Sequence, residues 1–170
     1  MRLAILLTGF MASGKTTAGT AAAKKLGLPF VDLDLLIEQT CGKSILQIFA
    51  DSGEKEFRKL ENRVFIDLLH GLARPMLIAC GGGLPVFAAN HLPMKNCRVI
   101  FLDTPWRIIE NRLATANDSR PLINGKTIQE IRKLYDDRHP VYLKHSEFVI
   151  QEEDQIFELV SKIIAGATKT

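Results

Sequence analysis

The segment GFMASGKT, residues 9–16, restricts the fold more than any other feature, because it matches the pattern G-x-x-x-x-G-K-[ST] at every fixed position. An apolar run at 3–7 precedes it, and an Ala-rich segment at 15–26 follows it. A strand entering and a helix leaving is the context in which this pattern forms a phosphate-binding loop, or P-loop. The glycines at positions 9 and 14 let backbone N–H groups surround phosphate oxygens, and the helix N-terminus adds its dipole.

The side chains of this loop predict a nucleoside triphosphate bound with Mg²⁺. We expect Lys15 to reach the β- and γ-phosphates and the Thr16 hydroxyl to ligate the metal. Kinases, switch GTPases and motor ATPases share such a loop, but the chain has no N-K-x-D guanine-specificity motif. With 170 residues it is also too short for the extra modules of most motor ATPases. A small P-loop kinase is the leading class.

Apolar, strand-like runs alternate with segments of helical periodicity. The runs are at 3–7, 29–34, 75–80, 97–103 and 147–150, and the helical segments are at 15–26, 34–40, 53–70, 105–115, 127–138 and 154–165. This alternation predicts an α/β fold in three layers, with a parallel sheet covered by helices on both faces. No linker divides the chain, so we expect a single domain over residues 1–170.

Composition excludes several classes of protein. A formal net charge of +3, without a dense Lys/Arg run, argues against nucleic acid as a partner. No stretch has the length of a membrane span, and the apolar run at 3–7 is shorter than a secretory signal needs. Cys41, Cys80 and Cys97 lack metal-ligand spacing and are expected to be reduced thiols. We expect a cytoplasmic protein, and a monomer because no exposed apolar helix stripe stands out.

Two aspartates and a glycine run follow predicted strands. In a strand, Asp32 and Asp34 would point to the same side, one toward Mg²⁺ or its water shell and the other toward a substrate hydroxyl. The alternative is that Asp34 caps the helix at 34–40. The glycines of ACGGGLP, residues 79–85, either floor a substrate pocket or form a plain tight turn.

Three arginines are candidates for anion binding, although each has an ordinary alternative. Arg58 could simply pair with Glu54 or Glu61 on its own helix, and Arg138 could satisfy carbonyls at a helix end. Arg120 lies in the long irregular segment 114–126, which is either a functional lid or disordered.

Taken together and in order, these motifs resemble those of the shikimate kinase family over nearly the whole chain. The matching segments are GFMASGKTT, FVDLDLLIE, GKSILQIFADSGEKEFRKLE, GGG, SRPL and YDDRHPVY. The third is the most diagnostic, because it is long and no general P-loop function requires it. The resemblance implies the nucleoside monophosphate kinase fold, with strand order 2-3-1-4-5, and transfer of the ATP γ-phosphate to the 3-hydroxyl of shikimate in aromatic amino-acid biosynthesis.

The resemblance also implies roles for residues at matching positions. Shikimate would be held by Asp34, Arg58, Gly82 and Arg138, with Glu61 steadying Arg58. Lys15, Asp34 and Arg120 would be catalytic, and Mg²⁺ would be bound by Thr16 and, through water, by Asp32. ATP would contact Ala12, Ser13, Gly14, Lys15, Thr16, Thr17, Arg112, Arg120 and Gln155. The lid would span about 112–125, and a substrate-binding helical region about 33–62.

The chain departs from the family pattern in two places. Members commonly carry a basic residue before the last helix that contacts adenine, whereas here the segment is QEEDQ (151–155), with Gln155 the nearest candidate. The segment 84–96 is also atypical and is expected to form a short helix near the pocket. Two alternative functions stay open: a kinase for another acceptor, such as gluconate or a nucleoside monophosphate, and a non-catalytic ATP-binding module.

Overall fold

The computed structural model describes residues 2–82, 96–115 and 125–167. Arg120, most of the expected lid and nearly all of the segment 84–96 lie outside these residues. Within the described part of the chain, no helix is both long and apolar enough to cross a membrane.

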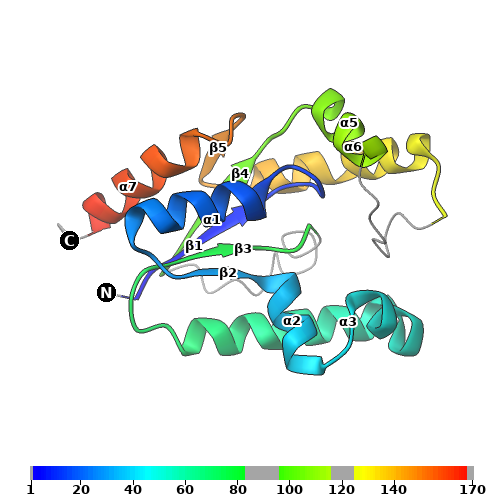
Figure 1. The fold of residues 1–170 in the computed structure, drawn as a ribbon, viewed down its shortest axis with the longest axis horizontal. Coiled ribbons are helices and arrows are strands. Elements are labelled where there is room, and N and C mark those ends of the chain that lie inside the picture. The colour runs from blue at the N-terminus through cyan, green and yellow to red at the C-terminus, as the bar shows by residue number, and fades with distance from the viewer. Residues whose placement is uncertain (1, 83–95, 116–124, 168–170) are drawn as a thin grey trace.

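A five-stranded parallel sheet forms the centre of the molecule (Figure 1). Its strands are β1 (Ala4–Thr8), β2 (Phe30–Asp32), β3 (Met76–Ala79), β4 (Cys97–Leu102) and β5 (Phe148–Ile150). Their order is β2-β3-β1-β4-β5, and every neighbouring pair is parallel. All five residues of the central strand β1 are buried, as expected for a strand covered on both faces. The predicted sheet and its strand order are confirmed.

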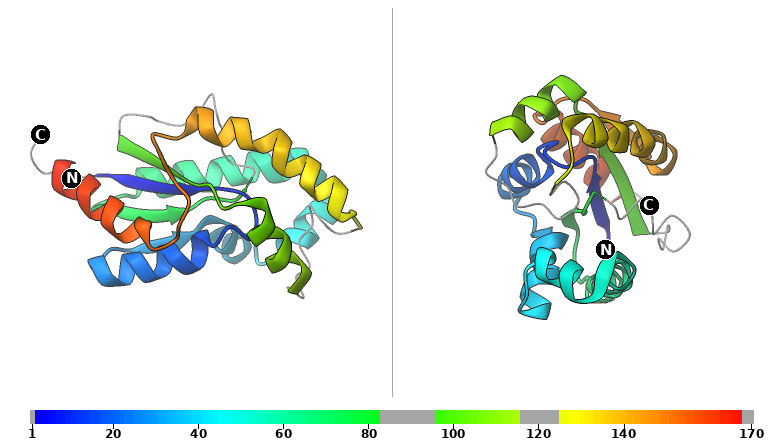
Figure 2. Two further views of the ribbon diagram at one scale, coloured as in Figure 1. Left: turned by 90° about the horizontal axis from the view of Figure 1, so that it is seen from above. Right: turned by 90° about the vertical axis from the view of Figure 1, so that its right-hand side faces the viewer.

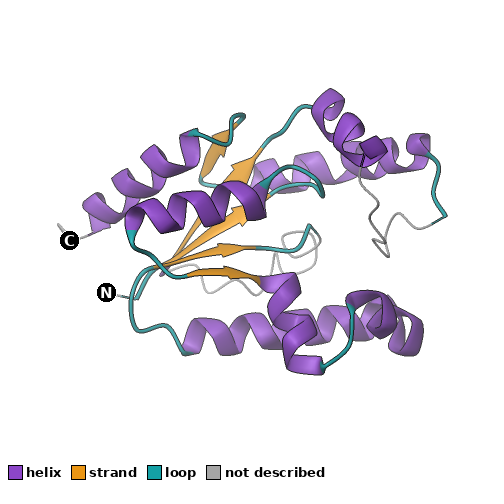
Figure 3. Ribbon diagram, viewed as in Figure 1, coloured by secondary structure: helices purple, strands orange, loops and turns teal. Residues whose placement is uncertain are grey.

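Six helices surround the sheet in the described residues (Figure 3). They are α1 (Lys15–Leu26), α2 (Leu33–Cys41), α3 (Ile45–His70), α5 (Trp106–Thr115), α6 (Ile128–His145) and α7 (Gln155–Ala167). Helices α1 and α7 lie side by side, α2 and α3 lie toward the β2 edge, and α5 and α6 lie toward β4 (Figures 1 and 2).

The alternation of side chains along β1 divides the core between the two faces of the sheet. Ala4 and Leu6 pack with residues of α2 and α3, whereas Ile5 and Leu7 pack with residues of α1 and α7. A third cluster lies beneath the P-loop, between β4 and helices α5 and α6; it consists of Phe10, Phe101, Ile109, Ile131 and Tyr142. This third cluster ties the P-loop to α6.

Two helices are longer than predicted. Helix α3 begins at Ile45 rather than residue 53, because Ser44 and Gln47 form a capping box, and it continues across a kink at Gly53. Helix α6 passes through Pro140 to His145, so the predicted end at residue 138 is wrong. The buried side chain of Tyr142 holds the last turns of α6 against β4, and this packing outweighs the usual cost of proline inside a helix.

Candidate active site

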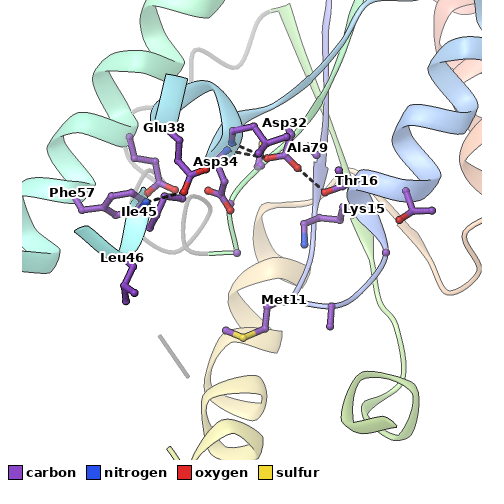
Figure 4. Close-up of a pocket in the computed structure, with 18 of the residues that line it drawn as sticks. Met11, Lys15, Thr16, Asp32, Asp34, Glu38, Ile45, Leu46, Phe57 and Ala79 are labelled. Carbon is purple, nitrogen blue, oxygen red and sulfur yellow. Dashed lines mark hydrogen bonds between the residues drawn. The ribbon is translucent and has the colours of Figure 1, made fainter. Parts of the chain in front are cut away.

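A cavity of about 810 Å³ lies at the carboxyl ends of the strands (Figure 4). Ligand sites in open parallel sheets form at this end. The cavity is lined by the P-loop, the start of α2, part of α3, the turn after β3, and single residues from α5, α6 and the loop after β5. It therefore brings together most of the predicted site residues: Ala12, Gly14, Lys15, Thr16, Thr17, Asp32, Asp34, Arg58, Gly82, Arg112 and Arg138.

The P-loop joins β1 to α1 through backbone conformations that most side chains avoid. Gly9 and Gly14 have φ angles of 149° and 98°. A Cβ atom at Gly9 would lie 2.8 Å from the carbonyl oxygen of Leu102, so the loop and β4 approach each other too closely for any other residue. Ser13, the remaining predicted ATP residue, is fully buried within the loop, and its carbonyl accepts a hydrogen bond from Thr104.

The ammonium group of Lys15 is held by the loop itself. Its Nζ donates hydrogen bonds to the carbonyls of Gly9 and Phe10, at 2.9 and 2.8 Å, and to Ser13 Oγ at 3.2 Å. Only 9% of the residue is exposed. A buried, hydrogen-bonded cation at a helix N-terminus attracts phosphate.

Asp32 ends β2 and also caps α2. One carboxylate oxygen accepts hydrogen bonds from the backbone N–H groups of Asp34 and Leu35, at 3.0 and 3.3 Å. The other accepts a hydrogen bond from Thr16 Oγ1 at 2.6 Å (Figure 4). The capping alternative for Asp34 is therefore wrong, since Asp32 is the cap.

Asp34 lies in the first turn of α2, so the premise that both aspartates sit on one strand is also wrong. Nevertheless, both carboxylates line the cavity, because α2 begins directly at the carboxyl end of β2.

Two guanidinium groups and a buried glutamate, from α3 and α6, also line the cavity. Arg58 pairs with Glu61 at 2.7 Å and with Glu54 at 3.2 Å. Glu61 is only 1% exposed, and burial raises the pKa of its carboxyl group, although the charge of Arg58 opposes this effect. Arg138, from α6, donates a hydrogen bond to the carbonyl of Gly82 at 3.3 Å.

Asp34 and Glu61 approach each other at the glycine turn. A Cβ atom at Gly81 would lie 2.6 Å from Asp34 Oδ1 and 2.8 Å from Glu61 Oε1. The absence of a side chain at Gly81 therefore lets two carboxylates share this part of the cavity. The negative charge of Asp34 contributes to the raised pKa of Glu61.

Arg112 lies on the P-loop side of the cavity. It donates hydrogen bonds to the carbonyl of Ala12 at 3.0 Å and to Glu153 Oε1 at 2.5 Å. The Glu153 carboxylate lies against Gly14, where any added Cβ atom would collide with it. A carboxylate of the chain itself thus sits at the N-terminus of α1.

Comparison with known proteins gives a consistent result. The family model described as shikimate kinase matches residues 11–168. The chain belongs to the shikimate kinase family. It is therefore a kinase that transfers phosphate from ATP to shikimate, a step of aromatic amino-acid biosynthesis.

Individual shikimate kinases resemble the chain over most of its length. One from Geobacillus thermodenitrificans is 39% identical over 164 residues, which cover 92% of this chain and 87% of that protein. The crystal structure of a Bacteroides thetaiotaomicron shikimate kinase superposes with a TM-score of 0.83 at 28% identity, covering 96% of this chain and 98% of that one. An Acinetobacter baumannii shikimate kinase in complex with shikimate has a TM-score of 0.78 at 28% identity, with coverage of 97% and 94%.

Gln155, predicted to contact ATP, does not line the cavity. It is the first residue of α7, and its side chain accepts hydrogen bonds from the backbone N–H groups of Gln151 and Glu152, both at 3.3 Å. It lies instead beside a separate hollow of about 400 Å³ next to β5. The acidic residue two positions earlier, Glu153, reaches the cavity in its place.

Sequence reasoning missed Glu153 and Tyr142 in this shikimate kinase. A signal existed for each. Glu153 follows the last parallel strand, and therefore lies at the carboxyl end of the sheet, as the P-loop does. Tyr142 is four residues after Arg138 and therefore shares its helix face. Neither sequence feature would identify a site residue unless the fold were known.

Proposed function

We propose that this shikimate kinase phosphorylates the 3-hydroxyl of shikimate within the 810 Å³ cavity, with ATP on the P-loop side and shikimate between α3 and α6. The observation that carries the proposal is that Arg58 and Arg138 line the same cavity as the P-loop. Two guanidinium groups provide the forked donors that suit a carboxylate, and shikimate is a carboxylic acid.

Mg²⁺ fits the oxygen atoms present at the start of α1. Thr16 Oγ1 and Asp32 Oδ2 lie 2.6 Å apart and form an all-oxygen set of the kind this ion prefers. Thr16 would bind the ion directly and Asp32 through water. When bound, the ion would offset negative charge on the transferring phosphoryl group.

Asp34 is the proposed partner of the reacting hydroxyl. Its carboxylate lies on the cavity wall at the start of α2, within the proposed substrate-binding region 33–62. The 3-hydroxyl oxygen would form a bond to the γ-phosphorus as the bond from that phosphorus to the β–γ bridging oxygen breaks. Asp34 would orient the hydroxyl and accept its proton, while Lys15 stabilises the phosphate oxygens.

We also propose roles for the lid and for the adenine site. A lid over 112–125 would bring Arg120 to the phosphoryl group and exclude water. Adenine would lie along Arg112, next to the loop that Gln155 holds in place. We further propose a single domain over 1–170 that acts as a monomer in the cytoplasm, without nucleic acid or a membrane as partner.

The decisive experiment measures ADP release that depends on ATP and Mg²⁺, with shikimate, quinate, gluconate and a nucleoside monophosphate as separate acceptors. We expect turnover with shikimate far above the rate without acceptor. Turnover only with another acceptor would overturn the pocket assignment. Tight ATP binding without turnover on any acceptor would indicate a non-catalytic module.

The matched test of the carboxylate site is Arg138→Lys, which keeps the charge but loses the forked donor geometry. We expect KM for shikimate to rise while KM for ATP stays near the wild-type value. An unchanged KM for shikimate would remove Arg138 from the acceptor site.

A further inference from the structure

Tyr142 is a buried phenol whose hydroxyl bonds Gly82, a residue of the cavity wall. Its ring stacks on Phe101 of β4, with ring centres 5.1 Å apart and planes at 30°, and only 1% of the residue is exposed. Packing on β4 therefore sets where its hydroxyl lies, because the ring has no room for another rotamer.

The hydroxyl of Tyr142 and the guanidinium of Arg138 meet at one carbonyl group. Tyr142 donates a hydrogen bond to the carbonyl oxygen of Gly82, and Arg138 donates a second to the same oxygen at 3.3 Å. The charge of Arg138 also acts on the nearby Tyr142 hydroxyl. The turn after β3 and one face of α6 are thus joined through three polar groups.

The hydroxyl remains a donor throughout the working pH range. Burial raises the pKa of Tyr142 to about 12, although the nearby charge of Arg138 acts in the opposite direction. Tyr142 and the Gly82 carbonyl are consequently both neutral partners of Arg138.

The two arginines of the acceptor wall are held in different ways. Arg58 is fixed by a salt bridge to Glu61 at 2.7 Å, which offsets part of its charge. Among the described residues, no carboxylate forms a salt bridge with Arg138, which is 6% exposed. The hydrogen-bond partners of Arg138 are neutral, so they orient its guanidinium without cancelling its charge, and the nearby Glu61 carboxylate acts on that charge only through space.

We propose that Tyr142 is a positioning residue for the acceptor: by holding the Gly82 carbonyl and Arg138 together, it sets the geometry in which Arg138 binds the carboxylate of shikimate. This inference rests on the proposed role of Arg138. It assigns Tyr142 to recognition of the acid group and to neither ATP binding nor phosphoryl transfer.

The test is Tyr142→Phe, which keeps the stacked ring and removes only the hydroxyl. We expect KM for shikimate to rise about five- to thirty-fold, the effect of losing one hydrogen bond next to a charged group. The value of kcat and KM for ATP should change less than about two-fold. Thermal unfolding of the variant, followed by circular dichroism, establishes that it is folded at the assay temperature.

A second acceptor separates positioning from a general structural effect. Shikimate methyl ester has no carboxylate, and its direct binding can be measured by calorimetry. If Tyr142 acts through Arg138, Tyr142→Phe weakens shikimate binding but leaves the weak binding of the ester nearly unchanged. Equal weakening of both ligands, or an unchanged KM for shikimate, would overturn the proposal.

Tyr135→Phe is the matched control. Tyr135 lies on the same helix, and its hydroxyl donates a hydrogen bond to a different backbone carbonyl, that of Thr104, at 3.3 Å. We expect it to leave KM for shikimate unaltered. If Arg138→Lys raises that KM and Tyr142→Phe does not, only the role of Tyr142 fails. If the wild-type enzyme does not use shikimate, the proposed function itself fails.

Discussion

At the scale of single residues, the site depends on carboxylates that have more than one partner. Asp32 accepts hydrogen bonds from Thr16 and from the first turn of α2, while Glu61 pairs with Arg58 and faces Asp34 across Gly81. Substituting any of these residues therefore changes several interactions at once. Conservative replacements that keep the shape of the side chain are the informative ones.

Asp34→Asn keeps the shape of the side chain and removes the proton acceptor. We expect kcat to fall about a hundred-fold or more, because general-base assistance commonly contributes that much, with little change in ATP binding. Steady-state kinetics together with ATP titration measure both quantities. A variant with wild-type kcat would exclude Asp34 from the mechanism.

Glu61 should make stability depend on pH. Its pKa is raised above its ordinary value of 4.5, so the folded state binds the proton more tightly than the unfolded state does. The stabilisation from this group is present below that value and is lost as pH rises through the folded pKa. Relative to Glu61→Gln, the free energy of unfolding of the wild-type protein should therefore decrease from acidic to neutral pH. Denaturant titrations across that range provide the test, and a pH-independent difference would contradict it.

At the scale of elements, Gly53 shows how backbone geometry joins two segments. It has φ 74° and ψ 173° within α3, a conformation that is nearly exclusive to glycine. A Cβ atom there would meet nothing within 4 Å. Any loss of folding stability on substituting Gly53 is therefore due to backbone strain alone and not to a steric clash.

Gly53→Ala should lower the free energy of unfolding by about 1–3 kcal/mol. The control is Gly166→Ala, within α7, where φ is not positive and an added Cβ atom is also in open space. That change should be neutral or stabilising by up to about 1 kcal/mol, since alanine is the better helix former. Urea unfolding of both variants distinguishes the two cases, and equal effects would contradict the backbone explanation.

The elements that the sequence predicted well are those that local patterns determine. The five parallel strands coincide with apolar runs: four runs contain the whole observed strand, and the run at 3–7 covers all of β1 except Thr8. Helix α6 was predicted too short because its continuation through Pro140 depends on Tyr142 packing against Phe101, a contact between residues far apart in the chain.

In the site, too, residues in contiguous motifs could be predicted, whereas those that depend on contacts between distant segments could not. The P-loop is a contiguous motif, so Lys15 and Thr16 could be placed from sequence. By contrast, the capping role of Asp32 depends on the exact residue at which β2 ends, which no pattern determines. The contact of Glu153 with Gly14 depends on how the loop after β5 lies over α1.

At the scale of the whole molecule, the site is assembled from helices that lie on either side of the central strand β1 in the strand order of the sheet. Helices α2 and α3 contribute Asp34 and Arg58 from the β2 side, and α5 and α6 contribute Arg112 and Arg138 from the β4 side. The proposed closure over ATP and shikimate would exclude water from the cavity.

Arg120→Ala tests that closure. We expect kcat to fall about a hundred- to a thousand-fold, since a cation delivered to the transferring phosphoryl group stabilises its charge, with a smaller change in KM for shikimate. Arg132→Ala, at an exposed position whose side chain pairs with Asp136, serves as the control and should retain near wild-type kcat. Normal turnover of Arg120→Ala would refute the role of the lid arginine.

Because Glu153 lies against the P-loop, we expect it to compete with ATP for the N-terminus of α1. The triphosphate and the Glu153 carboxylate are both anions drawn to the N-terminus of α1, and Glu153 is also bridged to Arg112. Salt screens the attraction of ATP and the internal bridge together. The apparent affinity for ATP should therefore vary less steeply with ionic strength in the wild-type protein than in Glu153→Gln. In that variant no carboxylate of residue 153 competes with ATP, so ATP should bind more tightly at low salt. ATP titrations at several salt concentrations would reveal this difference in slope, and parallel slopes would show that Glu153 does not compete.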